Sequence, residues 1–502
     1  MLKSVRTILV YNSEAVEKTE IIELLVSDKD IVVTGKNGPV QAQVEPFFDQ
    51  VKGEFTEDFL VLNTHFCFDP QILSPLSFTY IALRKGSHPT TKLIQILVPV
   101  NPSNIPELIS KHFHIKTVEN DEYSLRTARI SVKLNSKNGL LEVILLNFDL
   151  HKAGSESINS VNSSSTEQMK CRQQFEYYKS MSSGAYVMRL HEAKVSIYEN
   201  YRKKNENRLH MKLYIDMQDL VNKQLTTRFD TDLESDGIEY FTDNNGLQLI
   251  KRREYVEEER PESNYYPMST ALVLQDKSKR LSILSDTPHG VRKFNKISFE
   301  IMLDRHLVED DGKGLGFADD GIPTDNLPVN MEFTFVLEEL SPNKKQVCIT
   351  ELRSSVYQVT FTIDSIDRSK RELLVNPVSP FSSPTSFPCD VQLISLRPLA
   401  SKMNLRLMIL YKAGLDCSTS HYPACSADEL HVTFSEYLLF WFGHSCEKGV
   451  KSYLESIGAS SIQKTMLNGV EKIGKEMHYV NETFNLKPME FAAYLIKFNS
   501  LL

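Results

Sequence analysis

The sequence has no apolar run long enough to cross a bilayer, only one tryptophan and no net positive charge. Its longest apolar stretches, residues 93–100 and 437–442, are far shorter than the roughly 20 residues that a membrane-spanning helix needs. The formal net charge is −8, and the basic run Lys251-Arg252-Arg253 is followed at once by acidic residues, so it offers little attraction to a phosphate backbone. We therefore predict no transmembrane segment and no nucleic-acid partner.

Cysteine chemistry and export signals are also scarce. The seven cysteines form no CxxC pair and no Cys/His spacing typical of zinc. Cys417 and Cys425 could close a small disulfide loop. The alternative is that the cysteines are buried thiols, which their odd number and scattered positions favour. At the amino terminus Asn12, Ser13 and Glu14 follow a short apolar run, which is not the pattern of a signal peptide. As written, the chain is expected to remain in the cytoplasm.

The sequence does contain many segments with the residue pattern of β-strands, more than a single domain would hold. A length of 502 residues is too great for a single hydrophobic core. The first hundred residues are short β-rich runs separated by turns such as Asn37-Gly38-Pro39, and residues 101–106 then hold two prolines that cannot donate to a sheet. This pattern predicts a small immunoglobulin-like β-sandwich over residues 1–100.

Longer alternating strands follow. From Gly184 to about Leu340 polar and apolar residues alternate, as in residues 209–215 and 297–302, which is typical of two packed sheets. A proline-rich break at residues 376–388 is followed by renewed alternation from Val391. We predict an all-β chain of tandem β-sandwiches with few helices: a large one over residues 101–340 and a terminal one over residues 341–502.

Five strings between residue 183 and the carboxy terminus are more specific than β-sandwich composition requires. They are Ser183-Gly184-Ala185-Tyr186, residues 239–246, Asn264-Tyr265-Tyr266-Pro267-Met268, residues 300–307 with 310–316, and residues 488–494. In order and spacing they resemble strings of glycoside hydrolase family 38, in its Golgi α-mannosidase branch. The resemblance covers essentially the whole chain, although the first hundred residues match by pattern more than by string.

This resemblance implies the carboxy-terminal, non-catalytic half of such an enzyme, with a galactose mutarotase-like supersandwich as its large domain. The family's zinc-dependent catalytic half uses a pair of carboxylates, and its signatures are not present in this sequence. The fragment Phe442-Gly443-His444-Ser445 repeats the tail of one catalytic string without its Asp-Pro start, and we interpret it as coincidence. We assign no catalytic residue, no metal ligand and no cofactor to this chain.

Two residues are candidates for substrate binding because of the resemblance. The Tyr186 phenol could donate to a mannose hydroxyl, or Tyr186 could be a core tyrosine with a satisfied hydroxyl. The Arg305 guanidinium could hold a sugar hydroxyl or an active-site carboxylate, or it could form a structural ion pair with Asp304, Asp310 or Asp311. His306 replaces the second arginine of the family string. If both roles transfer, Tyr186 and Arg305 share one face of the large sandwich.

The functional prediction is an α-mannosidase-type protein of mannose metabolism and N-glycan processing that supplies the carbohydrate-facing β half. The resemblance places it in the Golgi lumen. Mannose-containing glycans and a separately encoded catalytic half are the expected partners. The alternative is a catalytically inert carbohydrate-binding or scaffold protein, and the sequence leaves open whether any hydrolase activity remains.

Overall fold

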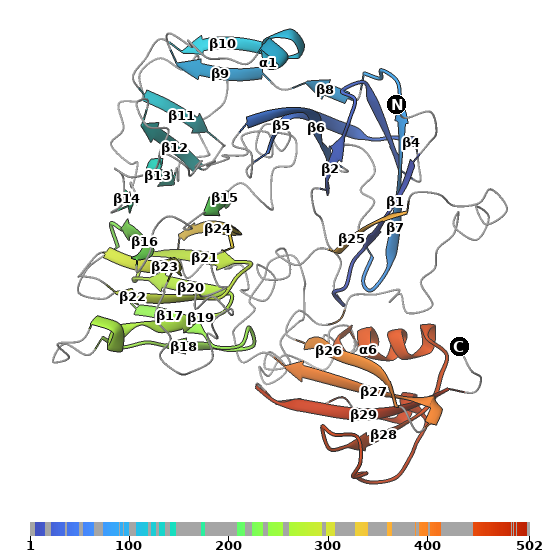
Figure 1. Cartoon of the computed structure of the whole chain (residues 1–502). Coiled ribbons are helices and arrows are strands. Elements are labelled where there is room, and N and C mark those ends of the chain that lie inside the picture. Colours follow the sequence, from blue (N-terminus) through green and yellow to red (C-terminus); the bar gives the residue numbers. More distant parts are fainter. Residues whose placement is uncertain are drawn as a thin grey trace, which may run out of the picture.

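In the computed structural model the described part of the chain consists mainly of β-sheets (Figure 1). It describes residues 6–15, 22–35, 38–49, 54–64, 74–89, 91–93, 95–99, 107–118, 122–126, 130–135, 141–146, 172–175, 208–215, 223–233, 239–254, 261–293, 298–306, 327–339, 359–363, 387, 391–399, 402–412 and 445–498, without 483, 485 and 488. These residues contain seven sheets but only two α-helices. The predicted all-β class is confirmed, and no described helix is long and apolar enough to cross a membrane.

The amino-terminal part is two sheets packed face to face. One sheet has the order β25-β1-β7-β3-β4 and the other β2-β6-β5-β8. The strands are β1 (Arg6–Tyr11), β2 (Ile22–Val26), β3 (Ile31–Gly35), β4 (Gly38–Pro39), β5 (Gln41–Asp49), β6 (Glu54–Thr64), β7 (Phe78–Lys85), β8 (Thr91–Leu93) and β25 (Val359–Ile363). Their inward side chains, such as Val10, Ile31 and Ile81, form one buried core between the sheets.

Smaller elements connect this part to the next. The strands β9 (Gln95–Pro99) and β10 (His114–Val118) pair in parallel, with helix α1 (Glu107–His112) between them in sequence. The strands β11 (Glu122–Arg126), β12 (Ile130–Asn135) and β13 (Leu141–Leu146) form an antiparallel three-stranded sheet.

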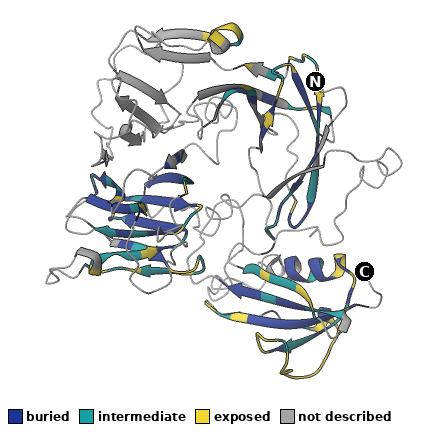
Figure 2. Ribbon diagram, viewed as in Figure 1, coloured by how far each residue is buried: buried dark blue, intermediate teal, exposed yellow. Residues whose placement is uncertain are grey.

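The central part is the large sandwich. Its five-stranded sheet has the order β14-β16-β23-β22-β19, with β14 (Arg172–Phe175), β16 (Lys223–Asp230), β19 (Tyr266–Met268), β22 (His289–Lys293) and β23 (Ser298–His306). Its six-stranded sheet has the order β15-β24-β21-β20-β17-β18, with β15 (Arg208–Ile215), β17 (Glu239–Asp243), β18 (Leu249–Lys251), β20 (Ala271–Gln275), β21 (Lys279–Ser285) and β24 (Val329–Glu339). Phe229, Phe299 and Phe335 are fully buried between the sheets, where Figure 2 shows most of the strands as buried.

The terminal part is a four-stranded sheet with a helix on one face. The sheet has the order β26-β27-β29-β28, with β26 (Val391–Leu399), β27 (Lys402–Lys412), β28 (Ala459–Thr465) and β29 (Phe491–Phe498). Helix α6 (Ser445–Ser456) contributes Val450, Tyr453 and Leu454 to the core against this sheet. The opposite face of the sheet carries a smaller apolar cluster around Leu407 and Leu495.

Contacts between these parts cross the breaks seen in the sequence. Strand β25 pairs with β1, so the first sheet takes a strand from beyond residue 340. Ala15 and Leu76 belong to the terminal core, and the Phe387 amide donates to the Ala15 carbonyl at 2.8 Å. The domain boundaries near residues 100 and 340 stay a prediction.

Candidate functional site

Strand β23 carries one of the family-like strings, and its two faces differ in chemistry. Phe299, Ile301 and Leu303 point into the core between the sheets. Because successive side chains in a strand point to opposite faces, Ser298 and Glu300 lie on the outer face of the five-stranded sheet. A carboxylate therefore occupies an outer-face position in the middle of a strand whose inner face is apolar.

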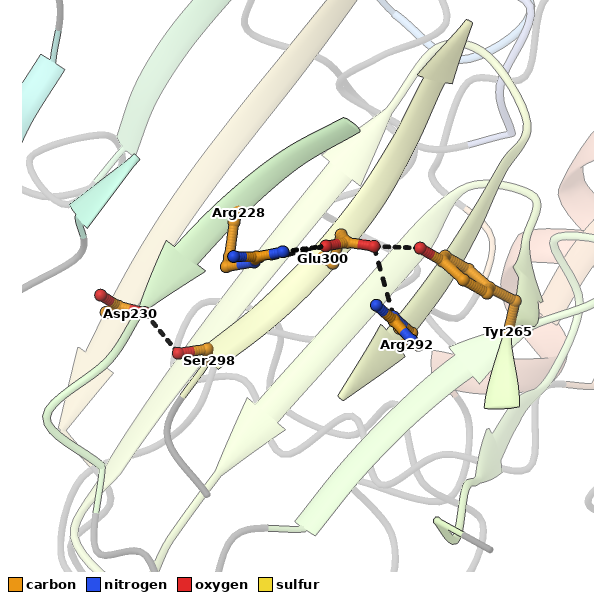
Figure 3. A network of polar contacts seen from close by, with 6 residues as sticks. All are labelled: Arg228, Asp230, Tyr265, Arg292, Ser298 and Glu300. Carbon is orange, nitrogen blue, oxygen red and sulfur yellow. Dashed lines mark hydrogen bonds and ion pairs between the residues drawn. The ribbon is translucent and has the colours of Figure 1, made fainter. Parts of the chain in front are cut away.

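Glu300 is the centre of a buried polar network on this face (Figure 3). Its side chain is only 5% exposed, and its Oε2 accepts hydrogen bonds from Arg228 Nη2 at 2.7 Å and Arg228 Nε at 3.3 Å. Its Oε1 accepts from Arg292 Nε at 3.3 Å and from the Tyr265 hydroxyl. The Ser298 hydroxyl donates to Asp230 on the neighbouring strand. Three strands and the segment before β19 are thus joined through one carboxylate.

The network keeps Glu300 ionised and Tyr265 protonated. Burial by itself raises the pKa of Glu300, but hydrogen bonds from Tyr265 and Arg228 and the charges of both arginines outweigh it and leave that pKa lowered. Burial and the hydrogen bond to Glu300 raise the pKa of the Tyr265 phenol. One carboxylate therefore faces two guanidinium groups, Arg228 and Arg292, whose side chains are 15% and 17% exposed.

A β-bulge near the end of β23 decides where Arg305 points. Thr226 pairs with Met302 and Leu225 pairs with Asp304, so Leu303 is an extra residue in the ladder. Simple alternation would place Arg305 on the inner face, together with Leu303.

The bulge instead returns Arg305 to the outer face. It pairs with Gln224, an exposed residue next to the buried Leu225, and directly paired residues lie on the same face. Arg305 is exposed, and its backbone N–H donates to Asp304 Oδ1 at 2.8 Å. Within the described part of the chain its guanidinium forms no ion pair, and Asp310 and Asp311 lie outside that part. Arg305 and Glu300 therefore share one face, and only Arg305 is open to solvent.

The other predicted site residue, Tyr186, lies outside the described residues. Its shared placement with Arg305 stays a prediction. His306, at the position of the second family arginine, is buried. Among the residues that the structure describes, no three His, Cys, Asp or Glu side chains are grouped so that they could hold a metal ion.

The string at residues 239–246 forms strand β17 of the same sandwich and the turn that follows it. The buried Asp243 carboxylate accepts from the backbone N–H groups of Gly246 at 2.6 Å, Thr270 at 2.9 Å and Ala271 at 2.7 Å, and from the Thr270 hydroxyl at 3.0 Å. Gly246 has a φ of 76°, which favours glycine. The loop contacts the terminal part, because the Tyr411 hydroxyl donates to the Leu247 carbonyl at 3.2 Å.

Glu300 and Tyr265 stand within the family-like strings, but the sequence predicts no role for either of them. The available signal was a glutamate at an outer position of a strand whose other face is apolar. The partners Arg228 and Arg292 stand 72 and 8 residues away from Glu300, and no local pattern connects Arg228 to it.

The two packed sheets carry the strings at residues 239–246, 264–268 and 300–306. Residues 192–313, which include β16, β22 and β23, match the glycosyl hydrolases family 38 C-terminal domain. This match and the relatives described next confirm the resemblance to the carboxy-terminal half of a family 38 enzyme that was drawn from the sequence.

Curated relatives match over part of the chain. "Alpha-mannosidase 2x" of Mus musculus is 31% identical over 226 residues, which are 42% of this chain and 19% of the relative. "Alpha-mannosidase 2" of Homo sapiens is 30% identical over 227 residues, which are 41% and 19% of the two chains. The chain thus matches about a fifth of the length of these relatives.

A solved α-mannosidase from Enterococcus faecalis V583 aligns with 99% of this chain and 56% of its own, at 11% identity and a TM-score of 0.43.

Proposed function

We propose that this chain is the carbohydrate-facing β half of a family 38 α-mannosidase that acts in mannose metabolism and N-glycan processing in the Golgi lumen. The bulge in β23 carries the proposal, because it turns Arg305 out of the core onto an open face within the matched domain. The names of the similar proteins, "Alpha-mannosidase 2x" and "Alpha-mannosidase 2", support the substrate class.

In this proposal the chain binds and orients, while a catalytic half performs the reaction. The planar Arg305 guanidinium donates to a mannose hydroxyl or to a carboxylate of that half, in bidentate geometry where the partner allows. Tyr186 is the second proposed substrate contact. The nucleophile, the general acid and the zinc would come from the catalytic half, which is a separate chain or the rest of a longer one.

Reconstitution tests the proposal. The 502-residue chain is mixed or co-expressed with a part of the mouse "Alpha-mannosidase 2x" that excludes the segment this chain matches, and hydrolysis of an aryl α-mannoside is followed. We expect turnover from the mixture, and only background turnover from the chain or that part by itself. Physical association of the two parts without any turnover would contradict the proposal.

The runner-up is a catalytically inert protein that binds carbohydrate or serves as a scaffold. It is favoured by the exposed Arg305 on the outer sheet face, which could hold a glycan or a partner without a catalytic half. Saturation-transfer NMR with a high-mannose oligosaccharide separates the two functions. Glycan binding by the chain without turnover in any mixture would select the inert protein.

A further inference from the structure

Exposed apolar side chains are concentrated in one segment of the terminal part. Among the described residues, eight of the twelve exposed large apolar side chains lie between residues 466 and 491. The densest group follows β28: Met466 is 48% exposed, Leu467 50% and Val470 79%. Scattered exposed apolar residues are ordinary, but a contiguous group of them marks an interaction surface.

These three residues form the tip of a hairpin, residues 464–477. Ile462 pairs with Met477, and Thr465 pairs with Lys472. Three backbone donors at the tip are satisfied within the hairpin: Gly469 N–H donates to Met466 O at 2.8 Å, and Val470 N–H donates to Asn468 Oδ1 at 2.9 Å. The Met466 N–H donates to Glu471 O at 2.9 Å. Satisfied backbone groups lower the cost of moving the tip into an apolar medium.

The hairpin is fixed on the sheet. Gly469 has a φ of 74°, and a Cβ there would stand 3.3 Å from Leu407 side-chain atoms. The turn therefore packs closely against the outer apolar cluster of the terminal sheet. Figure 2 shows the loop after β28 as largely exposed, and Met466, Leu467 and Val470 are open to solvent although the turn packs on the sheet.

The charges around the tip are mainly positive, in contrast to the chain's net charge of −8. Lys472 and Lys475 are exposed and Lys464 is half-buried. Two carboxylates oppose them. Glu476 lies 3.3 Å from Lys497, accepts from the Ser461 hydroxyl and also interacts electrostatically with Lys472, and Glu471 is the second acid.

We propose that this hairpin is a membrane-surface contact that inserts Met466, Leu467 and Val470 into the interfacial layer of an anionic bilayer. The lysines at its base then lie at the depth of the lipid phosphates. A protein partner would need a groove shaped to this convex tip, whereas a fluid lipid surface needs only apolar side chains, a satisfied backbone and nearby positive charge.

Co-sedimentation of the full chain with vesicles tests this proposal. The vesicles are pure phosphatidylcholine, or phosphatidylcholine with phosphatidylserine. We expect binding to the anionic vesicles that weakens with salt. Leu467→Ser with Val470→Ser should lower the partition coefficient at least about tenfold, and Lys472→Ala or Lys475→Ala about fivefold each. The matched control is Leu327→Ser, a residue 74% exposed on another part, and it should leave binding unchanged.

The outcomes are distinct. No binding to anionic vesicles, or binding that the double serine variant retains, overturns the proposal. Sedimentation velocity without lipid tests the alternative occupant. Self-association that the double serine variant abolishes would identify the hairpin as an interface between two copies and would overturn the proposal. Unchanged melting temperatures of the variants are the check that the hairpin substitutions leave the fold intact.

Discussion

Glu300 shows at the scale of one residue how the central sandwich tolerates a buried charge. Its carboxylate faces two arginines and a tyrosine hydroxyl with 5% of its side chain exposed. Glu300→Gln removes the charge and leaves Arg228 and Arg292 facing a neutral amide. We expect a loss of about 3 kcal/mol in the free energy of unfolding, because breaking a buried pair costs far more than breaking a surface pair. Urea denaturation at neutral pH measures it.

The control is Glu476→Gln, which removes an exposed partner of Lys497 and should cost less than about 1 kcal/mol. The pH dependence has a definite sign. Since the folded pKa of Glu300 is lowered from its ordinary 4.5, its contribution is complete above pH 4.5 and is lost as the pH falls through the folded value. Equal losses from both glutamine variants would contradict this account of the network.

A second residue-scale prediction compares two tyrosines. Tyr240 is buried in the central core, and its hydroxyl has no hydrogen-bond partner among the described residues. Tyr265 donates to Glu300. Tyr240→Phe should therefore stabilise the protein by about 1 kcal/mol, and Tyr265→Phe should destabilise it by a similar or larger amount. Thermal unfolding of the two single variants measures both signs, and two shifts in the same direction would contradict the prediction.

At the scale of elements, the turn between β21 and β22 is held by a buried histidine. His289 Nδ1–H donates to the Met302 carbonyl at 2.8 Å, so Nε2 accepts from the Ser285 hydroxyl at 2.9 Å and the Thr287 hydroxyl at 3.0 Å. Burial lowers the pKa of His289 below its ordinary 6.5. A proton on Nε2 would remove the acceptor for both hydroxyls.

Stability should therefore fall as the pH drops below about 6.5, because the unfolded chain takes up this proton first. His289→Asn removes the titrating group, so its free energy of unfolding should change less than that of the wild type between pH 7.5 and pH 5.5. Urea denaturation at the two pH values gives the comparison. Identical pH dependence of both proteins would show that His289 is not the group responsible.

Strand β23 shows which features the alternation of polar and apolar residues predicts and which it does not. Alternation predicts a strand over residues 297–302, and β23 covers Ser298–His306. The same alternation places Arg305 on the core side, and the extra residue Leu303 can be recognised only from the pairing with β16. A bulge depends on its partner strand, so the exposure of Arg305 does not follow from β23 by itself.

At the scale of the whole molecule, sheet content is encoded locally but the assembly of sheets is not. The break at residues 101–106 and the alternation after Val391 predict separate units. In the structure, however, Leu76 is buried in the terminal core with a φ of 53°, and β25 joins the first sheet. These contacts join residues several hundred positions apart, and no periodic pattern reports them.

Leu76→Ala tests this coupling. Although Leu76 precedes β7, we expect the variant to destabilise the terminal sheet by about 2–4 kcal/mol, because it leaves a cavity in the core that Leu76 shares with residues of α6 and β29. Amide hydrogen exchange in β29 measures the effect. Leu25→Ala, at a residue 54% exposed on β2, is the matched control and should change stability by less than about 0.5 kcal/mol. Faster exchange only in the amino-terminal sheets would contradict the shared core.

The central claim is that Arg305, turned outward by the bulge, contacts the substrate or the catalytic half and does not support the fold. Its most direct test is the kcat/KM of the reconstituted enzyme with Arg305→Ala, compared with Arg397→Ala, an exposed strand arginine in the terminal sheet. We expect Arg305→Ala to lower kcat/KM about 10- to 100-fold with an unchanged melting temperature, and Arg397→Ala to leave both unchanged. An unchanged kcat/KM with Arg305→Ala, or a loss matched by a fall in melting temperature, would contradict the account.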